Sequence, residues 1–195
     1  TLGGNGSIGG TLTVQSGGTL APGTSVGTFT VAGAVTLSGT TLMELNRSAS
    51  PLKNDRLVAP AITGGGALLV TNIGPTLING TTFQLFSTAV TGFSSVTLPA
   101  GYTWVDTLSA NGSIQVTAGG IDINPNPTNI TFSVTGSDLT LTWPSSHIGW
   151  QLWSNAVGLP ATNMWFPIPG ADATNQLLFN IDTAKTNVFF RMVLP

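Results

Sequence analysis

The 195-residue sequence predicts an all-β protein, with a parallel β-solenoid (β-helix) followed by a small β-sandwich. Three observations support this prediction. Apolar and small polar residues alternate along most of the chain, Gly-Gly-Thr phrases recur in its first part, and tryptophan concentrates after residue 128. Alternation with a period of two is typical of strands, and no long segment keeps the i, i+3, i+4, i+7 spacing of a helix.

The glycine-rich phrase returns about every eight to ten residues, at 9–14, 17–21 and 27–31. This spacing fits the rungs of a parallel solenoid, and it also fits the hairpins of an antiparallel sandwich. We favour the solenoid for residues 1–122, because short, similar strands almost without charge suit stacked rungs. The inward positions of those rungs are expected to be Leu12, Val14, Leu20, Phe29, Val31, Val35 and Leu37.

Strands are expected wherever alternation runs between Gly, Pro and Asn-Gly turn signals. In the N-terminal region these segments are 11–14, 28–31, 34–37, 41–45, 57–62, 67–71, 82–87, 95–98, 103–107 and 113–117. The pattern becomes less regular from Thr82 onward, where we expect antiparallel strands to close the coil.

A change of composition separates the two expected domains. Pro125 and Pro127 remove backbone donors and fix φ, which indicates a short extended linker over residues 123–127. Residues 128–195 then contain six alternating segments, 131–134, 139–143, 150–154, 164–168, 176–180 and 187–193. Such spacing is typical of a β-sandwich, and the region is shorter than the ~100 residues of a seven-stranded immunoglobulin-type domain. We therefore expect a sandwich that is one strand short.

Charge is scarce, at 6% of residues with a formal net charge of −2, and the first 43 residues contain no charged side chain. The chain lacks the basic field that nucleic acid or an anionic membrane would require, so neither is an expected partner. No apolar run is long enough for a helical membrane span, so membrane insertion is not expected. The low charge and the strand repeats favour an extracellular or bacterial cell-surface location. Thr1 begins within the repeat pattern, so we expect the sequence to be a piece of a longer protein.

The residues that catalysis needs are sparse. Cysteine is absent, which excludes disulfides, thiolate zinc sites and a cysteine nucleophile. His147 is the single histidine and has no evident partners for a Ser-His-Asp relay or a metal site. The carboxylates are isolated along the chain, whereas a glycosidase needs two across one bond. We therefore predict no enzyme, no catalytic residue, no cofactor and no metal site. The one charged cluster, residues 53–56, is expected to be a solvated turn.

Aromatic residues supply the best candidate for a ligand site. Trp150, Trp153 and Trp165 are the candidates, because tryptophan faces stack on sugar rings. Strand alternation places Trp150 and Trp153 on opposite faces, so at least one of them is expected in the core. These residues support an alternative function, a carbohydrate-binding or adhesin module that recognises surface glycans.

Two parts of the chain resemble known families. Residues 17–31 (GGTLAPGTSVGTFTV), followed by Glu44-Leu45 and by residues 54–58 (NDRLV), resemble the repeat that ends autotransporter-type passenger domains. That resemblance covers about residues 9–118 and implies a right-handed parallel β-helix on a secreted bacterial surface protein. Residues 139–144, 149–152 and 188–193 resemble a short fibronectin-III/immunoglobulin-like terminal domain of large bacterial surface repeat proteins, with departures at Trp153 and Met192. Such coils carry adhesins, proteases and inert stalks alike, so no activity follows from the resemblance.

The leading hypothesis is a non-catalytic extracellular structural protein that self-assembles head-to-tail into a fibre, by strand addition or by rung stacking. The first rung would expose unpaired strand edges, and a sandwich short of one strand would accept a strand by β-augmentation. We expect residues 1–20 to be the donor and the C-terminal domain the acceptor. The expected contact residues are Thr11, Leu12, Val14 and Leu20. Heterologous contacts of this kind extend into filaments instead of closing.

Overall fold

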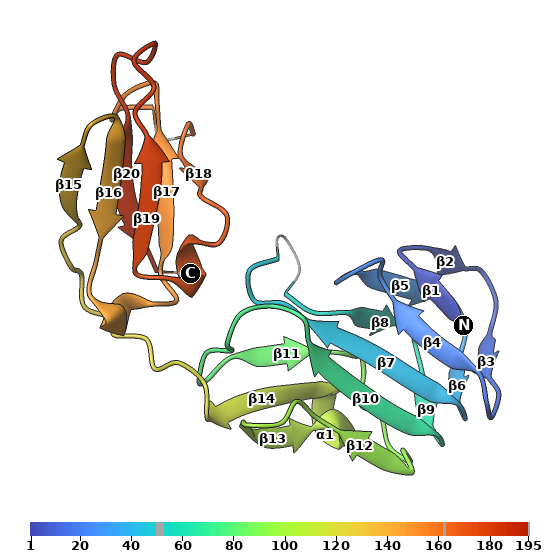
Figure 1. The fold of residues 1–195 in the computed structure, drawn as a ribbon. Helices are drawn as coiled ribbons and strands as arrows, with labels where there is room; N and C mark the ends of the chain where they lie inside the picture. The colour runs from blue at the N-terminus through green and yellow to red at the C-terminus, as the bar shows by residue number, and fades with distance from the viewer. Residues whose placement is uncertain (50–52, 162, 195) are drawn as a thin grey trace. The chain divides into compact units, whose positions relative to one another are not determined.

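The computed structural model describes residues 1–49, 53–161 and 163–194. The chain divides into two compact units, Thr1–Gly120 and Ile121–Pro195 (Figure 1). Both units are built from strands, with one short helix and two 3-10 turns among the described residues. The all-β prediction is therefore confirmed.

The N-terminal unit is a parallel β-solenoid of three complete rungs, whose strands stack into three sheets. The first rung comprises β1 (Leu2–Gly4), β2 (Ser7–Ile8) and β3 (Leu12–Val14). The second comprises β4 (Thr19–Pro22), β5 (Thr28–Val31) and β6 (Val35–Leu37), and the third β7 (Thr40–Leu45), β8 (Arg56–Val58) and β9 (Ile62–Gly64). Equivalent strands of successive rungs pair in parallel, which decides for the solenoid and against hairpins.

The solenoid core contains the side chains that alternation predicts to point inward. Val14, Leu20, Phe29, Val31, Val35 and Leu37 are buried, and Leu12 packs on the same core while partly exposed. Threonine takes most of the intervening outward positions in these strands. This arrangement follows from the period-two geometry of a strand, which sends successive side chains to opposite faces.

The C-terminal end of the coil is closed by antiparallel strands, as expected from Thr82 onward. The parallel sheet of β7 continues into β10 (Ala67–Asn72) and β12 (Ser95–Thr97). An antiparallel sheet then forms from β11 (Thr82–Gln84), β14 (Ser113–Ala118) and β13 (Thr103–Thr107), next to the helix α1 (Leu108–Asn111) (Figure 1). Phe83, Leu108 and Ile114 belong to the same core cluster as the rungs, so this sheet covers the last rung.

Two parts of the strand prediction differ from the structure. The strand expected over residues 57–62 is two strands, β8 and β9, with a corner between them at residues 59–61. Pro60, which lacks a backbone donor, lies at this corner. Strands β1, β2 and β4 and helix α1 were not predicted, because segments of two to four residues within a glycine-rich phrase show too little periodicity.

The C-terminal unit consists of two three-stranded antiparallel sheets around a common core. One sheet has the order β15 (Thr131–Thr135), β16 (Asp138–Thr142) and β19 (Gln176–Asn180). The other has the order β18 (Phe166–Pro167), β17 (Gln151–Asn155) and β20 (Phe189–Val193). Leu141, Trp143, Leu152 and Ala171 form the buried centre between them. All six strands predicted in this region are present.

Residues 123–127, the expected linker, are held against the C-terminal unit. The indole Nε1 of Trp150 donates to the carbonyl of Asn124 at 2.9 Å, and Nε2 of His147 lies 2.7 Å from the carbonyl of Asn126. The boundary between the two compact units falls at Gly120 and Ile121 instead.

Candidate functional site

The first rung of the solenoid presents three open strand edges. Strands β1, β2 and β3 pair with β4, β5 and β6 respectively, and no described strand pairs with their other side. The N–H of Leu12 donates to the second rung, at Ala34, and the carbonyl of Val14 accepts from Ser38 there. Because successive backbone groups of a strand point to opposite sides, the N–H and C=O of Thr13 face the open side.

The four predicted assembly residues differ in how deeply they are buried at the first and second rungs. Thr11 is exposed and Leu12 is partly exposed, whereas Val14 and Leu20 are buried. A shallow hollow of about 340 Å³ lies beside them, lined by Leu2, Leu12 and Val14 among others. Residues 1–20 are thus part of the folded rungs, and releasing them as a free donor strand would uncover the core at Leu20. The accessible feature is the rung edge itself.

Asp55 joins successive rungs at one corner of the solenoid. It is 1% exposed, its Oδ1 accepts the N–H of Gly27 at 2.8 Å, and its Oδ2 accepts the N–H of Glu44 at 2.8 Å. Burial raises the pKa of the Asp55 carboxyl to about 7, against the lowering effect of these two hydrogen bonds, and nearby Glu44 raises it further. The expectation of a solvated turn holds for exposed Lys53 and is wrong for Asp55.

The strand β15 forms an uncovered edge of the C-terminal unit. Its register with β16 and β19 places Phe132, Leu141 and Leu177 in one row across the sheet. Leu141 and Leu177 pack into the core, whereas Phe132 is 74% exposed, and Val134 in the neighbouring row is 53% exposed. The face that is core on β16 is therefore uncovered on β15. An uncovered apolar face of this kind is what we expect of a sandwich that lacks one strand.

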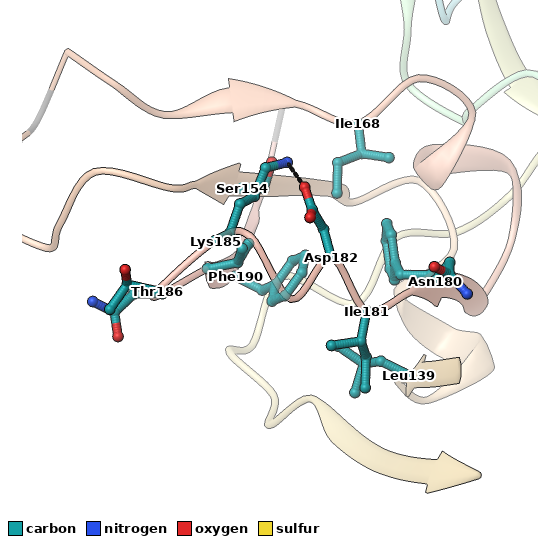
Figure 2. A pocket seen from close by; sticks show the side chains of 12 residues that line it. Leu139, Ser154, Ile168, Asn180, Ile181, Asp182, Lys185, Thr186 and Phe190 are labelled. Carbon is teal, nitrogen blue, oxygen red and sulfur yellow. Dashed lines mark ion pairs between the residues drawn. The ribbon is translucent and has the colours of Figure 1, made fainter. Parts of the chain in front are cut away.

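A cavity of about 400 Å³ opens in the C-terminal unit (Figure 2). Leu139 and Phe179 from one sheet and Phe190 from the other form apolar walls, and Asp182 and Lys185 form an exposed ion pair of 3.6 Å at its side. The walls can accept an apolar group, and the polar lining residues supply no nucleophile paired with a base. Alternation marks the wall residues as core, so the sequence contains no signal that the sheets leave a space here.

The three candidate tryptophans do not form one surface. Trp150 and Trp165 are buried and Trp153 is half-buried. The guanidinium carbon of Arg191 lies 5.4 Å from the ring centroid of Trp153 and 4.3 Å from that of Trp165. The structure thus brings Trp153 and Trp165 together around Arg191, in cation–π contacts, and leaves Trp150 apart in its bond to Asn124.

His147 lies inside the C-terminal unit. It is buried, packs against Trp150 with a ring-centroid distance of 5.4 Å, and has Nδ1 3.1 Å from Oγ of Ser146. Both ring nitrogens therefore contact neighbouring residues of the same unit. Across residues 1–49, 53–161 and 163–194, no three His, Cys, Asp or Glu side chains gather in a way that would hold a metal ion.

Comparisons with protein-family models, with curated proteins and with solved structures found no match. The solenoid fold is shown, and the autotransporter repeat remains a resemblance in sequence. The two parts of the resembling phrase meet in space, since Asp55 in the second part accepts a hydrogen bond from Gly27 in the first. In the part of the chain that the structure describes, no helix has the length and apolar character needed to cross a bilayer.

Proposed function

We propose that the protein is a non-catalytic structural protein that assembles with further copies of itself through unpaired strand edges. The observation that carries this proposal is the set of unpaired strand edges among the described residues. The first rung has three of them, and β12 and β15 each end a sheet with one strand neighbour. By contrast, residues 85–91 hydrogen-bond to the last rung at Leu57 and Gly64 and so cover β8 and β9. Unpaired strand edges readily pair with another chain, and solenoid ends need a cap or a stacked neighbour.

The proposed arrangement is head-to-tail, with the first rung of one copy against another part of the next. Rung stacking is favoured over release of residues 1–20, because stacking leaves the buried side chains of Val14 and Leu20 in place. Thr11, Leu12 and the backbone of Thr13 would make the contact. A contact between two different surfaces extends into a filament.

The proposed setting is the outside of a bacterial cell. Support comes from the scarcity of charge, the threonine-rich outer positions of the rungs and the resemblance to passenger repeats. Glycan binding through Trp150, Trp153 and Trp165 has less support. The rings of Trp150 and Trp165 are buried, and the guanidinium of Arg191 lies over the ring of Trp153.

The test is a pair of variants at Thr13, in the full chain. Thr13→Pro removes a backbone donor from the open edge without removing a bond to the second rung, whereas Thr13→Val keeps the donor and the side-chain shape. We expect filaments in negative-stain micrographs of the original chain and of Thr13→Val, and their loss in Thr13→Pro. A full chain that stays monomeric at all concentrations, or a Thr13→Pro variant with unchanged filaments, would contradict the proposal.

A further inference from the structure

The strand β15 lacks the protection that exposed sheet edges usually have. Its sequence, Thr-Phe-Ser-Val-Thr, contains no proline and no charge, and all five residues are exposed. By contrast, the edge strand β18 is two residues long and includes Pro167. Natural edge strands are blunted by proline, lysine or short length, and an unprotected apolar edge is a pairing site for another strand.

The sequence of β15 is self-complementary when two copies run antiparallel. With Ser133 opposite Ser133 of a second copy, Phe132 lies opposite Val134 and Thr131 lies opposite Thr135. Apolar side chains then meet apolar ones on one face, hydroxyl side chains meet on the other, and no charge enters the contact. We infer that β15 pairs with β15 of a second copy, around a two-fold axis at Ser133.

The backbone of β15 is oriented for this register. The β15–β16 hairpin has a two-residue turn with Gly136 at φ 62°, and Thr135 and Asp138 form its closing pair. The closing pair of such a hairpin exchanges backbone hydrogen bonds, so Thr131, Ser133 and Thr135 direct their backbone groups toward β16. The N–H and C=O of Phe132 and Val134 therefore face outward. In the proposed register these residues lie opposite each other and exchange both bonds.

The same register covers the exposed apolar side chains. Phe132 and Val134, at 74% and 53% exposed, would contact their counterparts on the face that is core on β16 and β19. The β15–β16–β19 sheets of the two copies would become one continuous six-stranded sheet. A slip of one residue would turn the partner's apolar face to the wrong side. A slip of two residues keeps the faces together but pairs three residues of β15 instead of five, so the register centred on Ser133 makes the most contacts.

This contact goes beyond the proposed filament contact and uses a different surface. A two-fold contact closes on itself and by itself gives dimers. It also occupies β15, so the first rung of another copy has to bind elsewhere. The two proposals therefore respond to different variants.

Cysteine cross-linking tests the register, because the chain contains no cysteine of its own. Opposite residues of a non-hydrogen-bonded antiparallel pair have Cα atoms about 4.5 Å apart, within disulfide range. We expect Ser133→Cys to form a disulfide-linked dimer under mild oxidation. Thr131→Cys is the matched control: its two copies would lie about 14 Å apart, since a strand advances about 3.4 Å per residue. On its own it is expected to form no disulfide, although the β15 contact remains, and it is expected to cross-link when mixed with Thr135→Cys.

Two outcomes overturn the inference: Ser133→Cys fails to cross-link, or Thr131→Cys alone cross-links as well as Ser133→Cys. Preferential cross-linking of Ser133→Cys to a Thr13→Cys chain also overturns it, because β15 would then receive the first rung. Thr13→Pro added to Ser133→Cys separates the proposals. Dimers that persist support the β15 contact even where filaments never form, and dimers that disappear contradict it.

Discussion

Two four-residue segments of this chain have almost the same sequence and opposite exposure. Residues 28–31 in β5 read Thr-Phe-Thr-Val, and residues 131–134 in β15 read Thr-Phe-Ser-Val. Phe29 and Val31 are 3% and 1% exposed, against 74% and 53% for Phe132 and Val134. The number of neighbouring strands, more than the local pattern, therefore determines whether such a segment is covered.

The surroundings of β5 explain its burial. It pairs with β2 on one side and β8 on the other, and its apolar side chains face the other two sheets of the coil. Residues of the first and third rungs hold the start of β5. Asn5 Oδ1 accepts the N–H of Thr28 at 3.2 Å, and Asp55 Oδ1 accepts the N–H of Gly27 at 2.8 Å. The other segment, β15, has one strand neighbour among the described residues, and the face of Phe132 is open.

The largest expected effect separates the two phenylalanines. Phe29→Ala should lower the free energy of unfolding of the solenoid by about 3–5 kcal/mol, because it leaves a cavity in a packed core. Phe132→Ala should change the stability of the monomer by less than about 0.5 kcal/mol, as surface substitutions do. Urea denaturation of both variants checks this, and equal losses would contradict the difference in burial.

The next effect concerns the corner that holds β5. Asp55→Ala should destabilise the solenoid by about 2–4 kcal/mol, because the N–H groups of Gly27 and Glu44 lose their acceptors inside the protein. Asp182→Ala is the control, since its ion pair with Lys185 is exposed and contributes at most about 1 kcal/mol. Thermal unfolding should rank the two variants in this order. A null effect at Asp55 would show that the corner is held by other contacts.

The pH dependence of stability follows from the raised pKa of Asp55. Its carboxyl has a pKa of about 7 in the folded chain and an ordinary value of 3.8, so the folded state binds the proton more tightly. The stabilisation from this group is present below about pH 4 and is lost as the pH rises to about 7. Denaturation midpoints of the original chain and of Asp55→Asn at about pH 5 and about pH 8 isolate this group. A gain in stability of the original chain relative to Asp55→Asn as the pH rises would contradict the predicted direction of the pH dependence.

A smaller effect is expected at Arg191, whose guanidinium lies against two tryptophan rings of the C-terminal unit. Arg191→Met keeps an unbranched apolar stem and removes the guanidinium between Trp153 and Trp165, with an expected loss of about 0.5–1 kcal/mol. Arg191→Lys should recover part of the loss, because lysine keeps the charge without the planar group. Chemical denaturation followed by tryptophan fluorescence measures both. Stabilities unchanged in both variants would mean that the stacked contacts contribute nothing.

Much of the fold could be predicted from alternation and turn residues. The strands β5, β13 and β19 have the predicted bounds, and the inward positions of the rungs are those expected. The corner at Pro60 escaped prediction because apolar residues continue across it. Strands β1, β2 and β4 escaped because their glycine-rich segments are too short to show a period.

The candidate sites were less predictable. The positions of Leu12 against the core and of Thr11 outside it follow from the repeat itself. The role of Asp55 does not, because its partner Gly27 lies 28 residues earlier and a charged cluster ordinarily indicates solvent. The exposure of β15 is also hidden, since Phe132 and Val134 alternate as core residues do. They are uncovered because the core cluster of this unit includes no residue of β15, which alternation does not show.

Sedimentation velocity of four chains, each spanning residues 1–195, tests most directly whether open strand edges drive association. Thr13→Pro and Val134→Pro each remove one outward N–H, at the first rung and at β15 respectively, and the double variant removes both. We predict concentration-dependent assemblies for the original chain, dimers for Thr13→Pro and monomers for the double variant. An original chain that sediments as a monomer at every concentration, or a double variant that assembles as the original does, would contradict association through these edges.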